Sequence, residues 1–258
     1  MRLLFIRHGD PDYEPDALTE KGRREAEALA AIIRDLKPGH IYSSPLGRAR
    51  ETAQHCLNVL KEEAVVMPWL EEFPARVDVE ESPELMRAFP KAQNEDGTWN
   101  KHIAWDIMPA YCAAHPELMD ARLWRTSTIA KHSDLLPTYD RVRKGFDSLL
   151  ASYGYVRQEH GVYRVDRETQ DTLTFFCHFG ISAVLLSILW DISPFIPLQM
   201  MCMLTTSVTE IVTEEREEGV AMFRMLRFGD LTHLNMAGEE PSFAARYREV
   251  YSDTTHRK

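Results

Sequence analysis

Residues Met1 to Gly9 read M-R-L-L-F-I-R-H-G, and this stretch decides the fold that we expect. The apolar run from Leu3 to Ile6 has the length of a strand that is buried on both faces of a parallel sheet. Arg7 and His8 follow it directly, and Gly9 allows the chain to turn sharply. Because open α/β sheets bind ligands at the carboxyl ends of their strands, this cation and imidazole predict a functional site.

Two later stretches also place cationic or titratable side chains after predicted strands. Residues 43–53 read S-S-P-L-G-R-A-R-E-T-A, follow a short predicted strand and carry Arg48. Residues 176–180 read F-C-H-F-G, close a predicted strand from Thr172 to Cys177 and carry His178. We therefore expect Arg48 and His178 to converge with the R-H-G stretch at one edge of one sheet.

Taken in order, the three stretches resemble a known family. R-H-G near the amino terminus, S-x-L-x-R-A-x-x-T-A after the second strand and a late H-x-G are similar to the motifs of the histidine phosphatase superfamily. The resemblance covers most of the chain and implies the phosphoglycerate-mutase-like fold. We expect an α/β protein: a three-layer α/β/α sandwich with a mostly parallel sheet, an antiparallel edge and an inserted helical cap. Alternating apolar residues in 207–213 and 220–228 predict a hairpin at that edge.

The expected cap lies between about residues 73 and 136. Periodicity weakens there, prolines recur, and three of the five tryptophans occur, namely Trp99, Trp105 and Trp124. Insertions of this kind usually carry specificity when they overhang a site. We expect these aromatic residues to form a small core of the cap itself rather than a ligand cage.

The composition is that of one folded domain. With 258 residues, 44% of them hydrophobic, the chain can bury a sizeable core, and we expect a single domain over residues 1–258. The formal net charge of −10 argues against nucleic acid or an anionic membrane as a partner. We expect instead a small anionic phosphorylated substrate, held in a local basic pocket. The oligomeric state stays open.

The four cysteines are widely spaced and follow no C-x-x-C pattern: Cys56, Cys112, Cys177 and Cys202. This spacing indicates neither a zinc site nor a disulfide framework, and it fits a reducing cytoplasm. We see no signal peptide at the amino terminus, and Val184 to Trp190 is too short to span a bilayer. The tail from Asn235 onwards is polar, and we expect its end to be disordered.

The helix after the second strand should aim Arg48 at an anion. Ser44 suits its N-cap and Pro45 its first helical position, so that Arg48 falls within the first turn. The amino terminus of a helix attracts anions through its dipole and its free N–H groups. We expect Arg50, in contrast, to face solvent or to pair with a carboxylate.

The resemblance implies roles for these residues in phosphoryl transfer, which needs an in-line nucleophile and positive donors around the phosphoryl oxygens. His8 would be the nucleophile, and water would hydrolyse the phosphohistidine. Arg7, Arg48 and Gly9 would bind the phosphate, the arginines through forked donors that match its oxygens. His178 would donate to the same oxygens and stabilise the charge that grows in the transition state. The mechanism requires no metal and no cofactor.

The general acid is expected to follow the third strand, which lies at Val65 to Met67. Both Glu71 and Glu72 stand there, and adjacent side chains of an extended segment point to opposite sides. The family's acid stands two residues after a leucine, and Leu70 makes that residue Glu72. Burial would raise the pKa of Glu72 and the arginines would lower it, so the direction stays open at this point.

A phosphoglycerate-mutase-type phosphotransferase is the first alternative. The family's mutases typically follow R-H-G with Ser or Thr and an Asn, and follow their acid with a basic loop that contains Tyr-Gly. This chain has Pro11 and Glu14 in the first stretch and Phe73-Pro74-Ala75-Arg76 in the second. These departures favour hydrolysis and leave the natural substrate open.

Two further alternatives are less favoured. A phosphate-binding protein of the same fold without turnover is disfavoured because both histidines and both arginines are present. A magnesium-dependent aspartate phosphatase would use Asp10 and Asp12, but beside Pro11 these are typical turn residues. A cysteine phosphatase is excluded, since no cysteine of the chain begins a C-x5-R motif.

Overall fold

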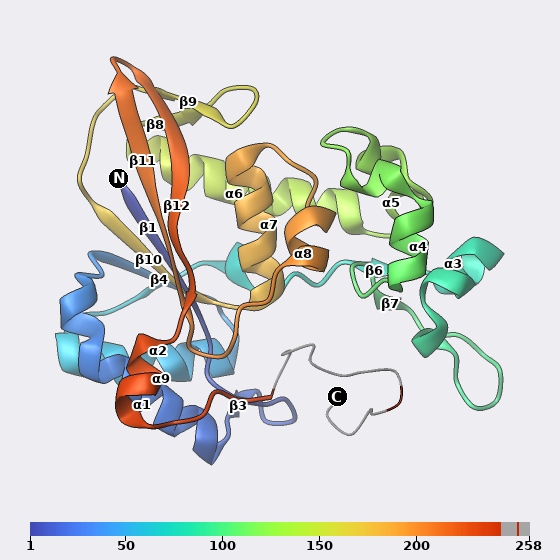
Figure 1. The fold of residues 1–258 in the computed structure, drawn as a ribbon, viewed down its shortest axis with the longest axis horizontal. Helices are drawn as coiled ribbons and strands as arrows, with labels where there is room; N and C mark the ends of the chain where they lie inside the picture. Colours follow the sequence, from blue (N-terminus) through green and yellow to red (C-terminus); the bar gives the residue numbers. More distant parts are fainter. Residues whose placement is uncertain (244–251, 253–258) are drawn as a thin grey trace.

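A computed structural model of the protein describes residues 1–243 and 252 (Figure 1). Most of the tail end that we expected to be disordered lies outside these residues. The strands of the central sheet are β1 (Arg2–Arg7), β4 (His40–Ser43), β5 (Val65–Val66), β8 (Tyr155–Arg157), β9 (Val162–Val165), β10 (Thr172–Cys177), β11 (Val208–Glu217) and β12 (Val220–Asp230). Two small sheets pair β2 (Pro11–Asp12) with β3 (Ala17–Leu18) and β6 (Arg76–Val77) with β7 (His102–Ile103).

The central sheet has eight strands in the order β5-β4-β10-β1-β11-β12-β9-β8. The first four run parallel to one another, and the last four pair antiparallel, starting with β11 against β1. The predicted α/β class with a parallel part and an antiparallel edge is confirmed. That edge is wide because β9 of the β8–β9 hairpin pairs with the start of β12 and continues the sheet.

The longer helices surround this sheet, and the short helices α3, α4 and α5 lie in the predicted cap. The α-helices are α1 (Glu20–Leu36), α2 (Gly47–Leu60), α3 (Pro83–Ala88), α4 (Pro109–Ala114), α5 (Thr128–Lys131), α6 (Leu135–Ser152), α7 (Phe179–Trp190), α8 (Phe195–Met200) and α9 (Thr232–Ala237). Short 3-10 helices occupy Pro68–Leu70, Val79–Glu81, Pro90–Ala92, Pro116–Met119 and Leu123–Thr126. In residues 1–243 and 252, no helix is long and apolar enough to cross a membrane.

Successive side chains of β1 point to opposite faces of the sheet, and both faces are covered by helices, which gives the three layers. Leu4 and Ile6 are fully buried in a core shared with α1 and α2. Leu3 and Phe5 point to the opposite face, where Phe5 stacks on Phe175 of β10 and the core continues into α6 and α7. Figure 1 shows α1, α2 and α9 on one side of the sheet and α6 and α7 on the other. A strand with apolar residues on both faces therefore forms the centre of the fold, as its sequence predicts.

Residues 73–136 contain α3, α4, α5, the small β6–β7 sheet and several 3-10 helices. Our expectation of a separate core in this segment is wrong for Trp124. Its ring lies 5.0 Å from that of Tyr139 on α6 and 6.3 Å from that of Phe195 on α8. The large indole is buried by the neighbouring helices because the short elements around it offer too little apolar surface. The role of the segment as a cap stays a prediction.

Candidate active site

The ends of three parallel strands bring the predicted residues together. The backbone N–H of His8, just after β1, donates to the carbonyl of Cys177 at 3.0 Å. The N–H of Ser44, just after β4, donates to the carbonyl of Phe176 at 2.9 Å. Because His178 follows β10 between them, His8, His178 and Ser44 lie side by side at one sheet edge. This is the edge at which open α/β sheets bind ligands.

His8 is held as a neutral imidazole with a lone pair on Nε2. Its Nδ1 lies 2.7 Å from the carbonyl oxygen of Gly9, which can only accept, so Nδ1 carries the proton. The ring is 1% exposed, and burial, together with the nearby Arg7 and Arg48 guanidiniums, keeps the pKa of His8 well below its usual value. Nε2 accepts from Nε of Arg48 at 3.4 Å. The unprotonated nitrogen therefore faces a cation.

Arg48 lies in the first turn of α2, but this helix begins later than predicted. Its N-cap is Leu46, not Ser44, and its first residue is Gly47, not Pro45. The reason is that the Ser44 hydroxyl accepts the N–H of Leu46 at 3.2 Å, which closes a local turn before the helix. The N–H of Gly47 is instead satisfied by Oδ2 of Asp16 at 2.6 Å.

Asp16 and Tyr13 reach Arg48 from the loop after β1. Oδ1 of Asp16 accepts from Nη1 of Arg48 at 2.5 Å. The Tyr13 ring is 67% exposed, and its centroid lies 5.3 Å from the Arg48 guanidinium carbon, within the range of a cation–π contact. Our sequence reasoning missed both contacts. The sequence shows that this loop contains acidic and aromatic residues, but their spacing does not indicate a contact with Arg48.

Arg7 is anchored beside the loop before β11. Its guanidinium Nη1 donates to the carbonyl of Met203 at 2.6 Å, and its side chain is buried. In the same loop, the N–H of Thr206 donates to the carbonyl of His8 at 3.2 Å. Thr206 has a positive φ of 54°, a strained conformation for a β-branched residue. A strained turn therefore supports both neighbouring residues of the R-H-G motif.

Gly9 has a packing role in this structure. A Cβ atom at this position would lie 2.6 Å from the carbonyl oxygen of Gly22, so only glycine lets the strand end approach α1. Its N–H donates to Oγ1 of Thr52 at 3.0 Å. The predicted contact of Gly9 with phosphate stays a prediction, and it requires this N–H to change its partner.

His178 faces His8 across the site. The ring centroids are 5.0 Å apart with the ring planes inclined by 57°, and His178 is fully buried. Burial, with help from His8 and the two arginines, keeps the pKa of His178 well below its usual value. Nε2 lies 2.7 Å from Oγ of Ser44. Nδ1 is buried and has no hydrogen-bond partner among the described residues.

Glu72 points to the amino terminus of α7. Its Oε1 accepts the N–H groups of Phe73 at 3.1 Å and of Ile181 at 3.3 Å. A Cβ atom on Gly180 would lie 2.6 Å from this oxygen, so the glycine makes room for the carboxyl group. Burial raises the pKa of Glu72, because it outweighs the opposing effect of Arg7 and the other nearby donors. This settles the direction that the sequence left open.

Glu71 points away from this group of residues. Its Oε1 accepts from Nη2 of Arg141 on α6 at 2.7 Å, in an ion pair at the surface. The two adjacent carboxylates therefore have different surroundings, as the alternation of an extended segment predicts.

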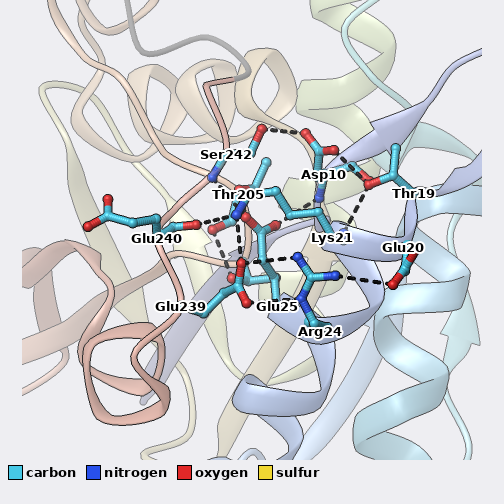
Figure 2. Close-up of polar contacts among 12 residues, drawn as sticks. Asp10, Thr19, Glu20, Lys21, Arg24, Glu25, Thr205, Glu239, Glu240 and Ser242 are labelled. Carbon is cyan, nitrogen blue, oxygen red and sulfur yellow. Dashed lines mark hydrogen bonds and ion pairs between the residues drawn. The ribbon is translucent and has the colours of Figure 1, made fainter.

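A second polar cluster lies behind the R-H-G loop, around Glu25 of α1 (Figure 2). Glu25 is fully buried and accepts from the N–H of Asp10 at 2.8 Å, the hydroxyl of Thr205 at 2.9 Å and the N–H of Ser242 at 2.9 Å. One carboxylate thus joins the loop after His8, the loop before β11 and the carboxyl-terminal segment. Sequence reasoning missed Glu25, since a glutamate in an amphipathic helix is normally solvent-facing.

The same carboxyl-terminal segment is fastened to α1 by surface charges. Glu239 pairs with Lys21 at 2.7 Å and with Arg24 at 3.0 Å. These two partners lower the pKa of Glu239 to about 2. Figure 2 shows Glu239 beside Arg24 and Ser242 beside Asp10.

Comparisons with known proteins agree with this geometry. Residues 3–121 match the family described as histidine phosphatase superfamily (branch 1). A 2,3-bisphosphoglycerate-dependent phosphoglycerate mutase of Thermoplasma acidophilum is 39% identical over 61 residues, which is 20% of this chain and 30% of that protein. The match thus spans less than a third of that relative's length.

Solved structures share the fold over most of their length. A mycobacterial glucosyl-3-phosphoglycerate phosphatase is 21% identical with a TM-score of 0.54, covering 88% of this chain and 98% of that one. A phosphoserine phosphatase of Entamoeba histolytica, solved as a variant with phosphoserine, is 17% identical with a TM-score of 0.53, covering 90% and 98%. The motifs, the family match and the fold confirm the resemblance that the sequence indicated. Residues 3–121 thus match the histidine phosphatase superfamily (branch 1), and the described chain has the fold of these phosphatases.

Proposed function

We propose that the protein is a phosphomonoester hydrolase that needs no metal ion and works through a phosphohistidine on His8. The observation that carries this proposal is the unprotonated Nε2 of a buried His8, which faces Arg48 and lies beside His178. A nucleophile with a depressed pKa stays neutral and reactive at neutral pH. The named activities of the structural neighbours, both phosphatases, support the same reaction class.

In the first step, Nε2 of His8 attacks phosphorus, and an N–P bond forms while the bond to the alcohol oxygen breaks. Arg7 and Arg48 bind the phosphoryl oxygens, with His178 and Gly9 as further donors. Glu72 donates its proton to the departing alcohol oxygen. Since Oε1 of Glu72 already accepts two N–H groups, Oε2 is the oxygen that carries the proton.

In the second step, water attacks the phosphohistidine. Glu72, now a carboxylate, takes one proton from this water as the N–P bond breaks. Phosphate leaves, and His8 and Glu72 return to their starting protonation states. The same group thus acts as acid and then as base, which a raised pKa allows near neutral pH.

A mutase-type phosphotransferase is the second candidate. It is favoured by the Thermoplasma relative, which is named as a mutase. The loop after R-H-G argues for hydrolysis, since Pro11 and Glu14 stand there where the family's mutases typically have Ser or Thr and an Asn. We propose a small phosphorylated substrate, in line with the phosphoserine and 3-phosphoglyceric acid that the Entamoeba phosphatase binds.

The phosphohistidine can be trapped with a phosphorus-32-labelled substrate and rapid quenching. We expect label on the protein that survives base and is lost in acid, as a phosphoramidate requires, and no label on His8→Ala. His160→Ala is the control, because His160 is an exposed turn residue. Acid-stable label, or label that persists in His8→Ala, would contradict the mechanism. Transfer of the label to phosphoglycerate rather than to water would favour the mutase.

Metal independence has its own test. Turnover of p-nitrophenyl phosphate should be unchanged by EDTA, since the two guanidiniums carry the positive charge and the His178 imidazole adds a neutral donor. Loss of activity in EDTA that magnesium restores would instead favour the aspartate mechanism with Asp10 and Asp12. Phosphate binding without any release from a panel of phosphomonoesters would favour a binding protein without turnover.

A further inference from the structure

Ser44 makes a contact that its expected role as a helix cap does not explain. Its hydroxyl oxygen lies 2.7 Å from Nε2 of His178, and both residues are fully buried. The backbone N–H of Ser44 is fixed on the carbonyl of Phe176, one strand away. The hydroxyl is therefore held against the imidazole by the sheet itself.

The direction of this hydrogen bond follows from the other partners. Oγ of Ser44 already accepts the N–H of Leu46 at 3.2 Å, so its own proton needs an acceptor. Within the described part of the chain, Nε2 of His178 is the acceptor in contact with it. A single donation from Oγ to Nε2 therefore satisfies the hydroxyl and the ring nitrogen together.

An accepting Nε2 places the ring proton on Nδ1, because a neutral imidazole has one N–H group. The ring is neutral, since burial and the two arginines hold the pKa of His178 well below its usual value. Nδ1 is the buried atom for which residues 1–243 and 252 offer no partner. A buried N–H left unpaired is destabilising, and a bound acceptor would remove that cost.

We propose that Ser44 is a positioning residue that fixes His178 as its Nδ1–H tautomer, so that Nδ1 donates to a phosphoryl oxygen at His8. The opposite tautomer would turn a lone pair towards the anionic oxygen and would leave the serine proton without an acceptor. This inference rests on the proposed function for the identity of the acceptor. The tautomer itself does not depend on it.

The tautomer can be read directly from nitrogen-15 NMR of the imidazole of His178, assigned with His178→Asn. We expect wild-type protein to carry the proton on Nδ1 and Ser44→Ala to show a mixture of both tautomers. The matched control is Ser43→Ala. Ser43 is the buried neighbour, and its hydroxyl donates to the carbonyl of Ser44 rather than to the ring. A proton on Nε2 in the wild-type protein would overturn the proposal, even if Ser44→Ala failed to fold.

Kinetics supply the second arm. Ser44→Ala should lower kcat on p-nitrophenyl phosphate on the order of 10- to 100-fold, while Ser43→Ala changes it little. In a His178→Ala background, Ser44→Ala should cost no further activity, since it acts through that ring. Equal losses in both backgrounds would mean that Ser44 acts by another route. Absence of phosphohistidine together with the expected tautomer would overturn the proposed function and leave the Ser44–His178 contact intact.

Discussion

Asp16 holds Arg48 and the start of α2 with one carboxylate. Oδ1 accepts from the Arg48 guanidinium at 2.5 Å, and Oδ2 accepts from the N–H of Gly47 at 2.6 Å. A Cβ atom on Gly47 would lie 2.0 Å from the carbonyl oxygen of Asp16, so the loop and the helix fit only through this glycine. The orientation of the guanidinium is therefore set by a loop far from it in sequence.

Arg48→Ala should reduce kcat/KM for p-nitrophenyl phosphate. The loss corresponds to at least about 3 kcal/mol of transition-state stabilisation, which is the contribution of one charged donor. Asp16→Asn should cost less, about 1 kcal/mol, because the guanidinium stays but loses a charge-assisted hydrogen bond. Arg50→Ala is the control, since Arg50 is exposed two residues away. A near-neutral Arg48→Ala would place the phosphate site elsewhere.

Glu72→Gln should slow the hydrolysis of alkyl phosphates strongly and that of p-nitrophenyl phosphate much less. The reason is that p-nitrophenolate leaves without protonation, whereas an alkoxide needs the acid. Values of kcat/KM for ethyl phosphate and p-nitrophenyl phosphate measure the difference, because kcat/KM reports the formation of the phosphohistidine and not its hydrolysis, which both substrates share. Glu71→Gln is the matched control, because Glu71 pairs with Arg141 at the surface. Equal losses on both substrates, or a selective loss in Glu71→Gln, would remove Glu72 from this role.

The pH dependence of the same two rates gives an independent check. Burial raises the pKa of Glu72, so its acid form persists to higher pH than that of an ordinary glutamate. The rate on ethyl phosphate should fall as pH rises through this pKa, because the proton donor is lost. The rate on p-nitrophenyl phosphate should lack this fall, and so should both rates in Glu72→Gln. A fall shared by both substrates in the wild-type protein would point to another group.

The centre of the fold could be predicted because its signals are local. The strand β1 is recognisable from its uninterrupted apolar run, and Arg7, His8 and His178 directly follow predicted strands. Parallel pairing of β1 with β10 then brings the carboxyl ends of these strands together. Ser44 was misread because its hydroxyl makes one local hydrogen bond, with Leu46, and one long-range hydrogen bond, with His178. From the sequence alone, a serine at this position fits a helix N-cap as well as it fits a contact with a histidine.

Long-range partners explain the rest of what the sequence did not reveal. Asp16 reaches Arg48, and Glu25 reaches Ser242, across separations that no periodicity encodes. Glu25 also departs from the pattern that places glutamate on the solvent side of a helix. Such polar residues are identified only after the fold has placed their donors around them.

His233 should make the protein less stable in mild acid. It is 1% exposed, its Nε2 contacts Oγ1 of Thr206 at 2.9 Å, and burial lowers its pKa to about 4. His233 therefore stays neutral in the folded state at pH values at which it is protonated in the unfolded chain. The free energy of unfolding should fall as the pH drops below 6.5, and it should continue to fall towards pH 4. The pKa difference corresponds to about 3 kcal/mol over this window.

Urea denaturation at several pH values measures this effect. His8 and His178 shift in the same direction, so the comparison is between wild-type protein and His233→Gln. Between pH 6.5 and pH 4, the free energy of unfolding should fall by about 3 kcal/mol less in His233→Gln than in the wild-type protein. His160→Gln is the control, because the side chain of His160 is 81% exposed. Identical pH profiles for wild-type protein and His233→Gln would show that His233 is not held neutral.

Glu25→Ala should destabilise the protein and release its carboxyl-terminal segment. The change removes the acceptor of three donors, the N–H groups of Asp10 and Ser242 and the hydroxyl of Thr205 (Figure 2). Each buried donor left unpaired costs about 1–3 kcal/mol. Because burial raises the pKa of Glu25, the loss of a buried charge offsets part of this cost, and we expect a net loss of about 2 kcal/mol.

Urea denaturation should give a lower midpoint with an unchanged m-value for Glu25→Ala. Hydrogen exchange at the N–H of Ser242 should be faster in this variant than in the wild-type protein. Glu20→Ala is the matched control, since Glu20 begins the same helix, its side chain is 93% exposed, and it pairs with Arg24 alone among the described residues. Glu25→Ala should also lower kcat, because Asp10 follows the R-H-G motif directly and Thr205 precedes the turn that supports His8. Unchanged exchange at Ser242 with full activity would mean that the carboxyl-terminal segment and the site are held independently of Glu25.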